Sequence, residues 1–247
     1  MKVKSILVSQ PEPKTESSPF HTLAERQKVK IDFRQFIQVD GVPATDFRKE
    51  KINLKDYQNI IFTSKNAVDH FFRLNEEMRN PISNDLRYFC ITEAIAYYLQ
   101  KYVVYRKRKI YFGKLTIQDL IPMLKKYKNE NFLLPSSDIL KPEIPETLEK
   151  GNIKYTRAVM YNTVAADLSD LKDVYYDILV FFSPEGIRSL YKNFPDFQQN
   201  NTRIAAFGTT THDAVQEAGL RLDIMAPTPE YPSMTKALEE YIKQVNK

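Results

Sequence analysis

Short apolar runs alternate with longer amphipathic stretches along most of the chain. The apolar runs predict strands, and the stretches with apolar residues every three or four positions predict helices. Runs 60–62 and 178–182 are apolar throughout, which is typical of strands buried on both faces of a parallel sheet. The alternation therefore predicts an α/β fold with mostly parallel sheets. We expect strands at 5–9, 29–39, 59–63, 87–91, 131–134, 153–164, 177–182, 203–207 and 222–226, and helices at 66–77, 95–102, 117–126, 144–150, 187–193, 212–218 and 234–245.

Residues suited to capping stand where these elements end. Ser64, Thr92 and Ser183 directly follow expected strands, and a hydroxyl there can accept a hydrogen bond from the first turn of the next helix. Gly151 and Gly219 directly follow expected helices, where a left-handed residue often ends the helix. We therefore expect left-handed caps at both glycines.

The chain contains a permuted internal repeat. Residues 61–68 (Ile-Phe-Thr-Ser-Lys-Asn-Ala-Val) align with residues 180–187 (Val-Phe-Phe-Ser-Pro-Glu-Gly-Ile), which lie 119 positions later. At an offset of 118, Thr92 aligns with Thr210, although the surrounding match is loose. A repeated strand–helix unit predicts two similar lobes.

Two long expected strands, 29–39 and 153–164, carry polar residues at many positions, unlike central strands. We interpret them as the segments that cross between the lobes. The first lobe then comprises residues 1–37 plus 166–247, and the second is the insert 38–165, which includes the connecting strands. The expected fold class is α/β with two lobes, each a parallel β-sheet flanked by helices, joined by two crossing strands.

Composition excludes several classes of protein. Of the 247 residues, 43% are hydrophobic and 27% are charged, which excludes a disordered chain or a coiled coil. Apolar runs stay well below the roughly 18 residues that span a bilayer, so no membrane association is expected. The single cysteine, Cys90, cannot form an intramolecular disulfide, which predicts a cytoplasmic protein. Three dispersed histidines and one cysteine make a zinc site improbable, so no metal is expected.

The charge balance favours an anionic ligand without specifying one. Lysine and arginine number 36 against 31 acidic residues, a formal charge of +5. The densest basic cluster, 106–109, is interpreted as a solvated loop or edge strand rather than a ligand-steering site. A nucleic-acid partner is not expected.

Candidate binding residues lie at the carboxyl ends of expected strands, where open α/β sheets bind ligands. A capping role alone is the competing interpretation for each serine, and Pro184 also fits the first position of a helix. For Gly208-Thr-Thr-Thr211, three hydroxyls exceed the needs of one cap and favour ligand contact. The candidate substrate-binding residues are Ser64, Lys65, Asn66, Thr92, Ser136, Ser137, Ser183, Pro184, Thr209, Thr210 and Thr211.

Familiar catalytic motifs are missing from the sequence. There is no Gly-x-x-x-x-Gly-Lys-Ser/Thr loop, no Gly-x-Gly-x-x-Gly after the first strand and no Gly-x-Ser-x-Gly elbow. His70 and Cys90 are interpreted as packed side chains, and His212 more as structural than as a ligand contact. Tyr161 lies on a crossing strand and could donate a proton or hydrogen bond, although most tyrosines must be structural.

An ordered set of motifs resembles the uroporphyrinogen-III synthase family over essentially the whole chain. Residues 60–71 and 179–187 resemble its strand–Ser–helix motif, and 205–211 resembles its second Gly-x-x-Thr segment. Residues 226–229 resemble the entry to its C-terminal helix, and Tyr161 and Thr163 match its Val-Tyr-x-Thr segment. Each motif is weak alone, and the order carries the resemblance.

The resemblance implies a cyclising lyase of tetrapyrrole (haem) biosynthesis. The family converts the linear tetrapyrrole hydroxymethylbilane to uroporphyrinogen III, with inversion of ring D and loss of water. No cofactor is implied, and two lobes would close around the polyanionic substrate. Tyr161 becomes the candidate acid that assists hydroxyl departure. A monomer is expected, with a transient contact to the preceding enzyme of the pathway.

Departures from the family pattern keep other interpretations open. The family's Thr-Arg-Pro reads Ser-Gln10-Pro here, Cys90 replaces a glycine, Glu93 replaces a threonine and His212 replaces an alanine. One alternative is a two-lobed, non-catalytic protein that senses an anionic metabolite. A second is a group-transfer enzyme for a phosphorylated or nucleotide substrate, which the missing phosphate loop disfavours.

Overall fold

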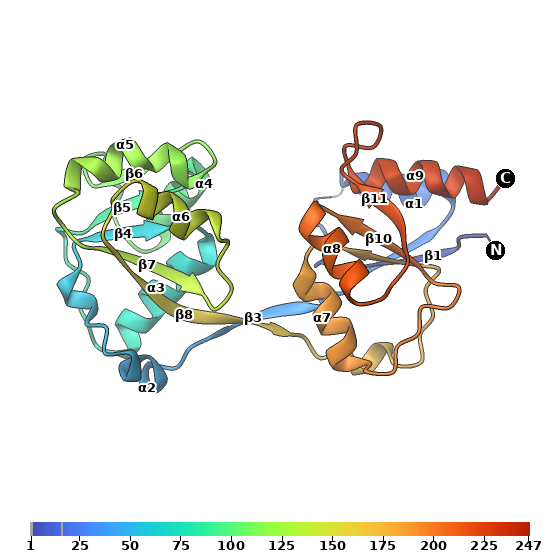
Figure 1. The fold of residues 1–247 in the computed structure, drawn as a ribbon, viewed down its shortest axis with the longest axis horizontal. Coiled ribbons are helices and arrows are strands. Elements are labelled where there is room, and N and C mark those ends of the chain that lie inside the picture. Colours follow the sequence, from blue (N-terminus) through green and yellow to red (C-terminus); the bar gives the residue numbers. More distant parts are fainter. Residues whose placement is uncertain (1, 16) are drawn as a thin grey trace. The chain divides into compact units, whose positions relative to one another are not determined.

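The computed structural model describes residues 2–15 and 17–247, and the chain divides into two compact units. The first unit contains the described residues up to 38 together with 164–247, and the second contains 39–163. Each unit is built on its own sheet (Figure 1). The expectation of an α/β fold with parallel-rich sheets flanked by helices is confirmed.

The first unit has a five-stranded sheet. Strand β1 pairs in parallel with β2 and β9, and β10 pairs in parallel with β9 and β11. Strand β9 is buried along its whole length, as its continuous apolar run predicts, and β10 is buried at its three middle residues. In spatial order the strands are β11 (Leu222–Ala226), β10 (Arg203–Phe207), β9 (Ile178–Phe181), β1 (Ser5–Val8) and β2 (Lys30–Phe33).

Helices cover both faces of this sheet (Figure 1). Helices α1 (Pro19–Gln27) and α9 (Met234–Val245) pack together on one face, where Leu23 and Leu238 join the buried cluster. Helices α7 (Pro184–Asn193) and α8 (Thr209–Glu217) cover the other face. Both faces are therefore apolar and closed to water, which leaves the strand ends as the places where polar groups gather.

The second unit has a six-stranded sheet. Its strands, in spatial order, are β3 (Ile37–Gly41), β8 (Tyr155–Ala165), β7 (Phe132–Ser137), β4 (Asn59–Phe62), β5 (Arg87–Cys90) and β6 (Ile110–Phe112). Strands β8, β7, β4, β5 and β6 pair in parallel. Strand β6 follows the basic cluster 106–109 at the sheet edge, a position that the sequence left open between loop and edge strand.

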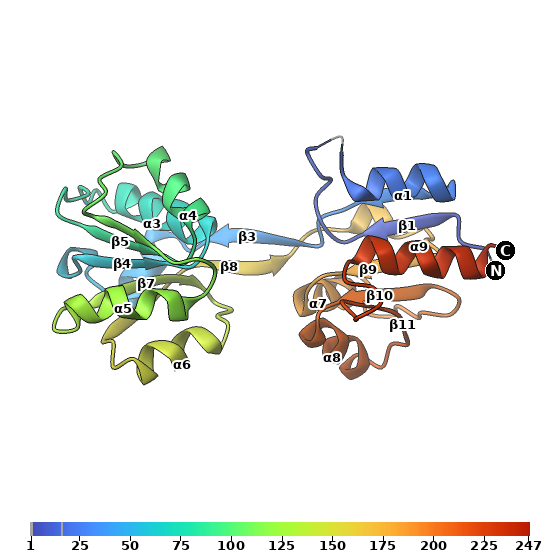
Figure 2. The same ribbon diagram turned by 90° about the horizontal axis from the view of Figure 1, so that it is seen from above.

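The helices of the second unit also lie on both faces of its sheet (Figure 2). One face carries α2 (Ala44–Phe47), α3 (Lys65–Glu77) and α4 (Glu93–Tyr98). The other carries α6 (Glu143–Lys150) and α5 (Ile121–Leu124), which continues a 3₁₀ turn. Further 3₁₀ turns lie at Arg48–Glu50, Leu54–Asp56, Leu99–Lys101, Lys125–Tyr127 and Ser169–Leu171.

The expected strand at 29–39 is wrong as a single element. The structure breaks it into β2 and β3, which belong to different sheets. Phe36, between them, is buried, and its carbonyl accepts hydrogen bonds from the Ala166 amide and the Ser189 hydroxyl. The break thus depends on distant partners that local periodicity does not show. The second crossing segment forms one strand, β8.

Only one of the two expected glycine caps is left-handed. Gly219, after α8, has φ +69° and fits the expectation. Gly151, after α6, has φ −77°, and the left-handed residue is Asn152 with φ 54°. Asparagine tolerates this region better than most side chains. The left-handed residue after α6 is therefore Asn152, one position later than expected.

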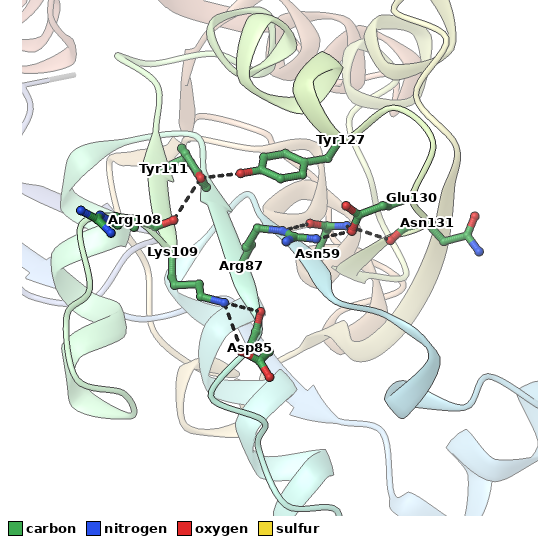
Figure 3. Close-up of polar contacts among 9 residues, drawn as sticks. All are labelled: Asn59, Asp85, Arg87, Arg108, Lys109, Tyr111, Tyr127, Glu130 and Asn131. Atoms are coloured by element: carbon green, nitrogen blue, oxygen red, sulfur yellow. Dashed lines mark hydrogen bonds and ion pairs between the residues drawn. The ribbon is translucent and has the colours of Figure 1, made fainter.

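A polar cluster holds together the amino ends of the strands in the second unit (Figure 3). Arg87, the first residue of β5, donates to Asn59 Oδ1 at 2.7 Å and forms an ion pair with Glu130. Asn59, which is fully buried at the start of β4, donates to the same carboxylate at 2.9 Å. The Arg87 guanidinium also lies 4.3 Å from the Tyr127 ring centroid. These bonds tie β4, β5 and the segment before β7 at the edge opposite the candidate site.

We expect Arg87→Met to lower the free energy of unfolding by about 2 kcal/mol, because it leaves a buried asparagine and a carboxylate without a charged donor. Chemical denaturation measures the change. Lys30→Met is the matched control, since its ion pair with Asp32 is exposed and should contribute about 0–1 kcal/mol. Equal effects of the two substitutions would contradict a stabilising role for the Arg87 cluster.

Candidate functional site

The internal repeat is visible as two equivalent helix starts. Ser64 follows β4 and caps α3, and Ser183 follows β9 and caps α7. Their backbones match closely, with φ/ψ of −156°/164° and −155°/156°. Each hydroxyl accepts a hydrogen bond from the amide three residues on, that of Ala67 at 3.0 Å and that of Gly186 at 3.4 Å. Both serines are therefore caps. Lys65, Asn66 and Glu185 keep first-turn amides that have no partner within their helix, as an anion site requires, whereas Pro184 has no N–H.

The carboxyl edge of the second unit brings several predicted residues together. Ser64 Oγ lies 3.0 Å from Tyr161 Oη, which joins the end of β4 to β8. Lys65 and Asn66 are exposed in the first turn of α3, and the Lys65 ammonium lies 5.3 Å from the Tyr98 ring centroid. Thr92 caps α4 by accepting from the Ile95 amide at 3.3 Å. Hydroxyls, amides and a cation thus share one edge.

A bulge in β8 sets the direction of Tyr161. Ser136 pairs with Val159, but Ser137 pairs with Tyr161, so β8 holds one extra residue at this point. Met160 and Tyr161 consequently belong to the same buried cluster, although successive residues of a regular strand face opposite sides. The extra residue turns the phenol toward Ser64, which sequence alternation alone could not reveal.

The phenol of Tyr161 is held in its protonated form. Burial raises the pKa of Tyr161 above its usual value near 10, and the Asp138 carboxylate adds to the rise while the Ser64 hydrogen bond opposes it. The side chain is only 6% exposed. At neutral pH the phenol can therefore donate a proton or a hydrogen bond.

Ser136 and Ser137 belong to β7, which extends three residues beyond the strand expected at 131–134. They are the last residues of β7 and are 1% and 8% exposed. The Ser136 hydroxyl accepts from Arg157 Nε at 3.0 Å and donates to the Ser137 carbonyl, and the Ser137 hydroxyl donates to the Ile139 carbonyl. The strand extends beyond its apolar run because Arg157 and the backbone satisfy both hydroxyls, and substrate contact by either serine stays a prediction.

Sequence reasoning missed Asp138 as a residue that positions Tyr161. Its amide donates to the Tyr161 carbonyl at 3.1 Å, and its carboxylate accepts from the Thr163 amide at 2.8 Å. An aspartate directly after a strand was the available signal. Arg157 adds bonds to the carbonyls of Ser137 and Asp138, at 2.8 and 2.6 Å, and so fixes this end of β7.

In the first unit, the threonine run divides into exposed and buried members. Thr209 and Thr210 are exposed in the first turn of α8, whereas Thr211 is 1% exposed. Thr209 and Thr210 thus reach the surface and Thr211 does not, and ligand contact by these hydroxyls stays a prediction. Gly208, with φ +89°, directly precedes the helix at the N-cap position, and among the described residues no side chain caps α8. Pro184 occupies the first turn of α7, as expected.

His212 and Cys90 are structural. His212 Nε2 lies 2.9 Å from the Ala206 carbonyl and 3.0 Å from the Ala226 carbonyl, so the ring bridges the ends of β10 and β11. Cys90 is fully buried, and burial raises the pKa of its thiol to about 12. Within residues 2–15 and 17–247, no group of three His, Cys, Asp or Glu side chains is arranged to hold a metal ion.

A cavity of about 610 Å³ in the first unit lies away from the predicted edge. Its lining includes Tyr176 and Thr202, which precede β9 and β10, and Asn193 at the end of α7. It therefore opens at the amino ends of the strands. A helix long and apolar enough to cross a bilayer does not occur in the part of the chain that the structure describes.

Sequence comparison identifies relatives of this chain. The model of the family described as uroporphyrinogen-III synthase HemD matches residues 19–236. A uroporphyrinogen-III synthase of Chlorobaculum parvum is 25% identical over 98% of this chain and 100% of its own length. The enzyme of the same name from Saccharomyces cerevisiae is 26% identical over 51% of each chain.

Structural comparison gives the same fold. The uroporphyrinogen-III synthetase of Helicobacter pylori matches with a TM-score of 0.61 at 19% identity, covering 98% of this chain and 99% of its own. A mutant uroporphyrinogen III synthase of Thermus thermophilus matches with a TM-score of 0.54 at 14% identity, with the same coverage. With the family match spanning most of the chain, these findings show that the chain belongs to the uroporphyrinogen-III synthase family.

Proposed function

We propose that this protein cyclises hydroxymethylbilane to uroporphyrinogen III, with inversion of ring D and loss of water. The family match over residues 19–236 carries the proposal. The single buried cysteine supports a cytoplasmic location. Because the linear substrate closes spontaneously to the wrong isomer, we further propose that a monomer receives it through a transient contact with the preceding enzyme.

The candidate residues suit a substrate with many carboxylates. Exposed first-turn positions of α3 and α8, including Lys65, Asn66, Thr209 and Thr210, offer amides, hydroxyls and one cation to an anion. The net charge of +5 favours capture of a polyanion. Isomer selectivity would follow from holding the linear chain in one conformation while its ends react.

Tyr161 is the proposed general acid. Its phenol is protonated at neutral pH and lies within hydrogen-bond distance of Ser64 at the carboxyl edge of the sheet. The phenol would give its proton to the substrate hydroxyl as the carbon–oxygen bond breaks, so that water leaves and a substrate cation remains. Ser64 would hold the phenol oxygen in place and share its hydrogen bond as charge develops.

Binding of an anionic metabolite without turnover remains the second candidate, and Glu93 favours it. Glu93 is exposed in the first turn of α4, so it brings a negative charge close to a helix start that a substrate carboxylate would use. Cys90 and Gln10 also depart from the family pattern. Tight binding of hydroxymethylbilane without a new product would favour this candidate.

The decisive experiment supplies purified protein with fresh hydroxymethylbilane, oxidises the products and separates the type I and type III uroporphyrin isomers. We expect a protein-dependent shift to type III, because spontaneous closure gives type I. Type I alone from folded protein would contradict the proposed cyclase and favour the binding protein.

We expect Tyr161→Phe to lower kcat by about 100-fold or more if the phenol is the acid, with little change in KM. Isomer-resolved kinetics measure the loss, and thermal unfolding checks that the variant folds. Tyr97→Phe, at a tyrosine that is 58% exposed, is the matched control and should keep full activity. A fully active Tyr161→Phe variant would remove the phenol from the mechanism.

Lys65→Met should raise KM about fivefold and leave kcat unchanged, because an exposed cation at a helix start contributes about 1 kcal/mol to binding an anion. The increase should shrink at high salt as screening grows. Lys55→Met, at another exposed lysine of the second unit, provides the comparison. A KM that stays at the wild-type value would exclude Lys65 from substrate binding.

A further inference from the structure

Helix α3 contacts the ring of Tyr161 and the backbone next to it, in addition to the contact of Ser64 with the phenol oxygen. Arg73 lies on the same side of α3 as His70 and Glu77, which are three and four residues away. Its Nη2 donates to the Val42 carbonyl at 2.9 Å and to the Met160 carbonyl at 3.1 Å. Since Met160 precedes Tyr161 in β8, Arg73 fixes the backbone from which the phenol projects.

The guanidinium of Arg73 makes further contacts, with the Glu77 carboxylate and next to Gly41. Its Nη1 donates to Glu77 Oε1 at 2.6 Å, and the other oxygen of that carboxylate accepts from the Ala44 amide at 3.2 Å. A β-carbon on Gly41 would lie 2.7–2.8 Å from the guanidinium, so the glycine is the residue that leaves room for it. Arg73 thereby ties α3 to β8 and to the segment that follows β3.

His70 holds the face of the phenol ring. The two rings are stacked, with centroids 4.9 Å apart and planes 19° from parallel. Arg73 Nε donates to His70 Nδ1 at 3.0 Å, which assigns the remaining imidazole proton to Nε2. Burial and the Arg73 charge lower the pKa of His70, against opposing effects of Asp69 and Glu77, so the stacked ring is neutral at neutral pH.

We propose that His70 and Arg73 are positioning residues for Tyr161: Arg73 fixes the backbone beside Tyr161 and the orientation of His70, and His70 fixes the plane of the phenol. The proposal rests on the proposed function for its effect on turnover, whereas the placement of the ring is a property of the protein without substrate. Ser64 then contacts the phenol oxygen of Tyr161, His70 stacks on its ring, and Arg73 bonds the Met160 carbonyl in the backbone beside it.

Tyr161 lies directly after the bulge in β8. The bulge makes Met160 the extra residue of β8, and Tyr161, which follows it, pairs with Ser137, so the alternation of a regular strand does not set the direction of the phenol. A proton donor that is misplaced by about 1 Å can lose about 100-fold in rate, so a ring held only at its oxygen would transfer its proton less often. Stacking on His70 supplies the constraint that the strand does not.

The first test places 3-fluorotyrosine at position 161 and records its ¹⁹F resonance without substrate. We expect His70→Ala to shift and broaden the line, and His70→Phe, which keeps a ring to stack, to keep it narrow. Arg73→Lys should also broaden it, because one ammonium cannot make the same set of bonds. His21→Ala is the matched control, since His21 lies on α1 of the other unit.

The second test measures isomer-resolved kinetics of the same variants. For His70→Ala we expect kcat to fall at least about tenfold with KM nearly unchanged, and for His70→Phe we expect most of kcat to return. A wild-type ¹⁹F line in His70→Ala would overturn the proposal, as would a wild-type kcat in that variant. A disturbed line in a protein that forms no type III product would instead uphold the placement of the ring and overturn the proposed function.

Discussion

The amide groups at the start of each helix are the constraint around which the structure is arranged. The first amides of a helix have no partner within it, and in a parallel α/β sheet these groups meet at the carboxyl ends of the strands. Ser64 and Ser183 each satisfy one amide with nearly identical backbone geometry, in two units of different sequence. The amides that remain are the groups through which we propose that each unit binds carboxylates.

The position of Tyr161, the candidate acid, depends on the bulge in β8 and not on the regular strand–helix arrangement. Tyr161 joins the buried cluster because β8 contains an extra residue beside Ser137. Contacts from α3 and its cap then hold Tyr161 where the regular strand geometry is interrupted. Ser64 contacts the phenol oxygen, His70 stacks on the ring, and Arg73 bonds the backbone of the preceding residue. In the proposed function, the helix that would present amides to the substrate also orients the proton donor, so binding and chemistry would depend on the same element.

Departures from the family pattern have different structural meanings. Cys90 lies inside a buried strand, and His212 bridges the carbonyls of Ala206 and Ala226, so both act on packing. Glu93 is different, because it is exposed at a helix start and brings negative charge to a position suited to a carboxylate. That charge is the feature most opposed to the proposed function, and it acts at α4 alone.

The sequence by itself determined the class of fold, most of the strands and helices and the capping serines, although α1, α2 and β6 lay outside the expected elements. The predicted features follow from hydrophobic periodicity and from local hydrogen bonds, which involve neighbouring residues. The tertiary structure alone decided the break between β2 and β3, the burial of Ser136, Ser137 and Thr211, and the contacts of Tyr161. Each of these depends on partners far along the chain, such as Ala166 for Phe36 and Arg157 for Ser136, and the periodicity of a segment carries no record of a distant hydrogen-bond partner.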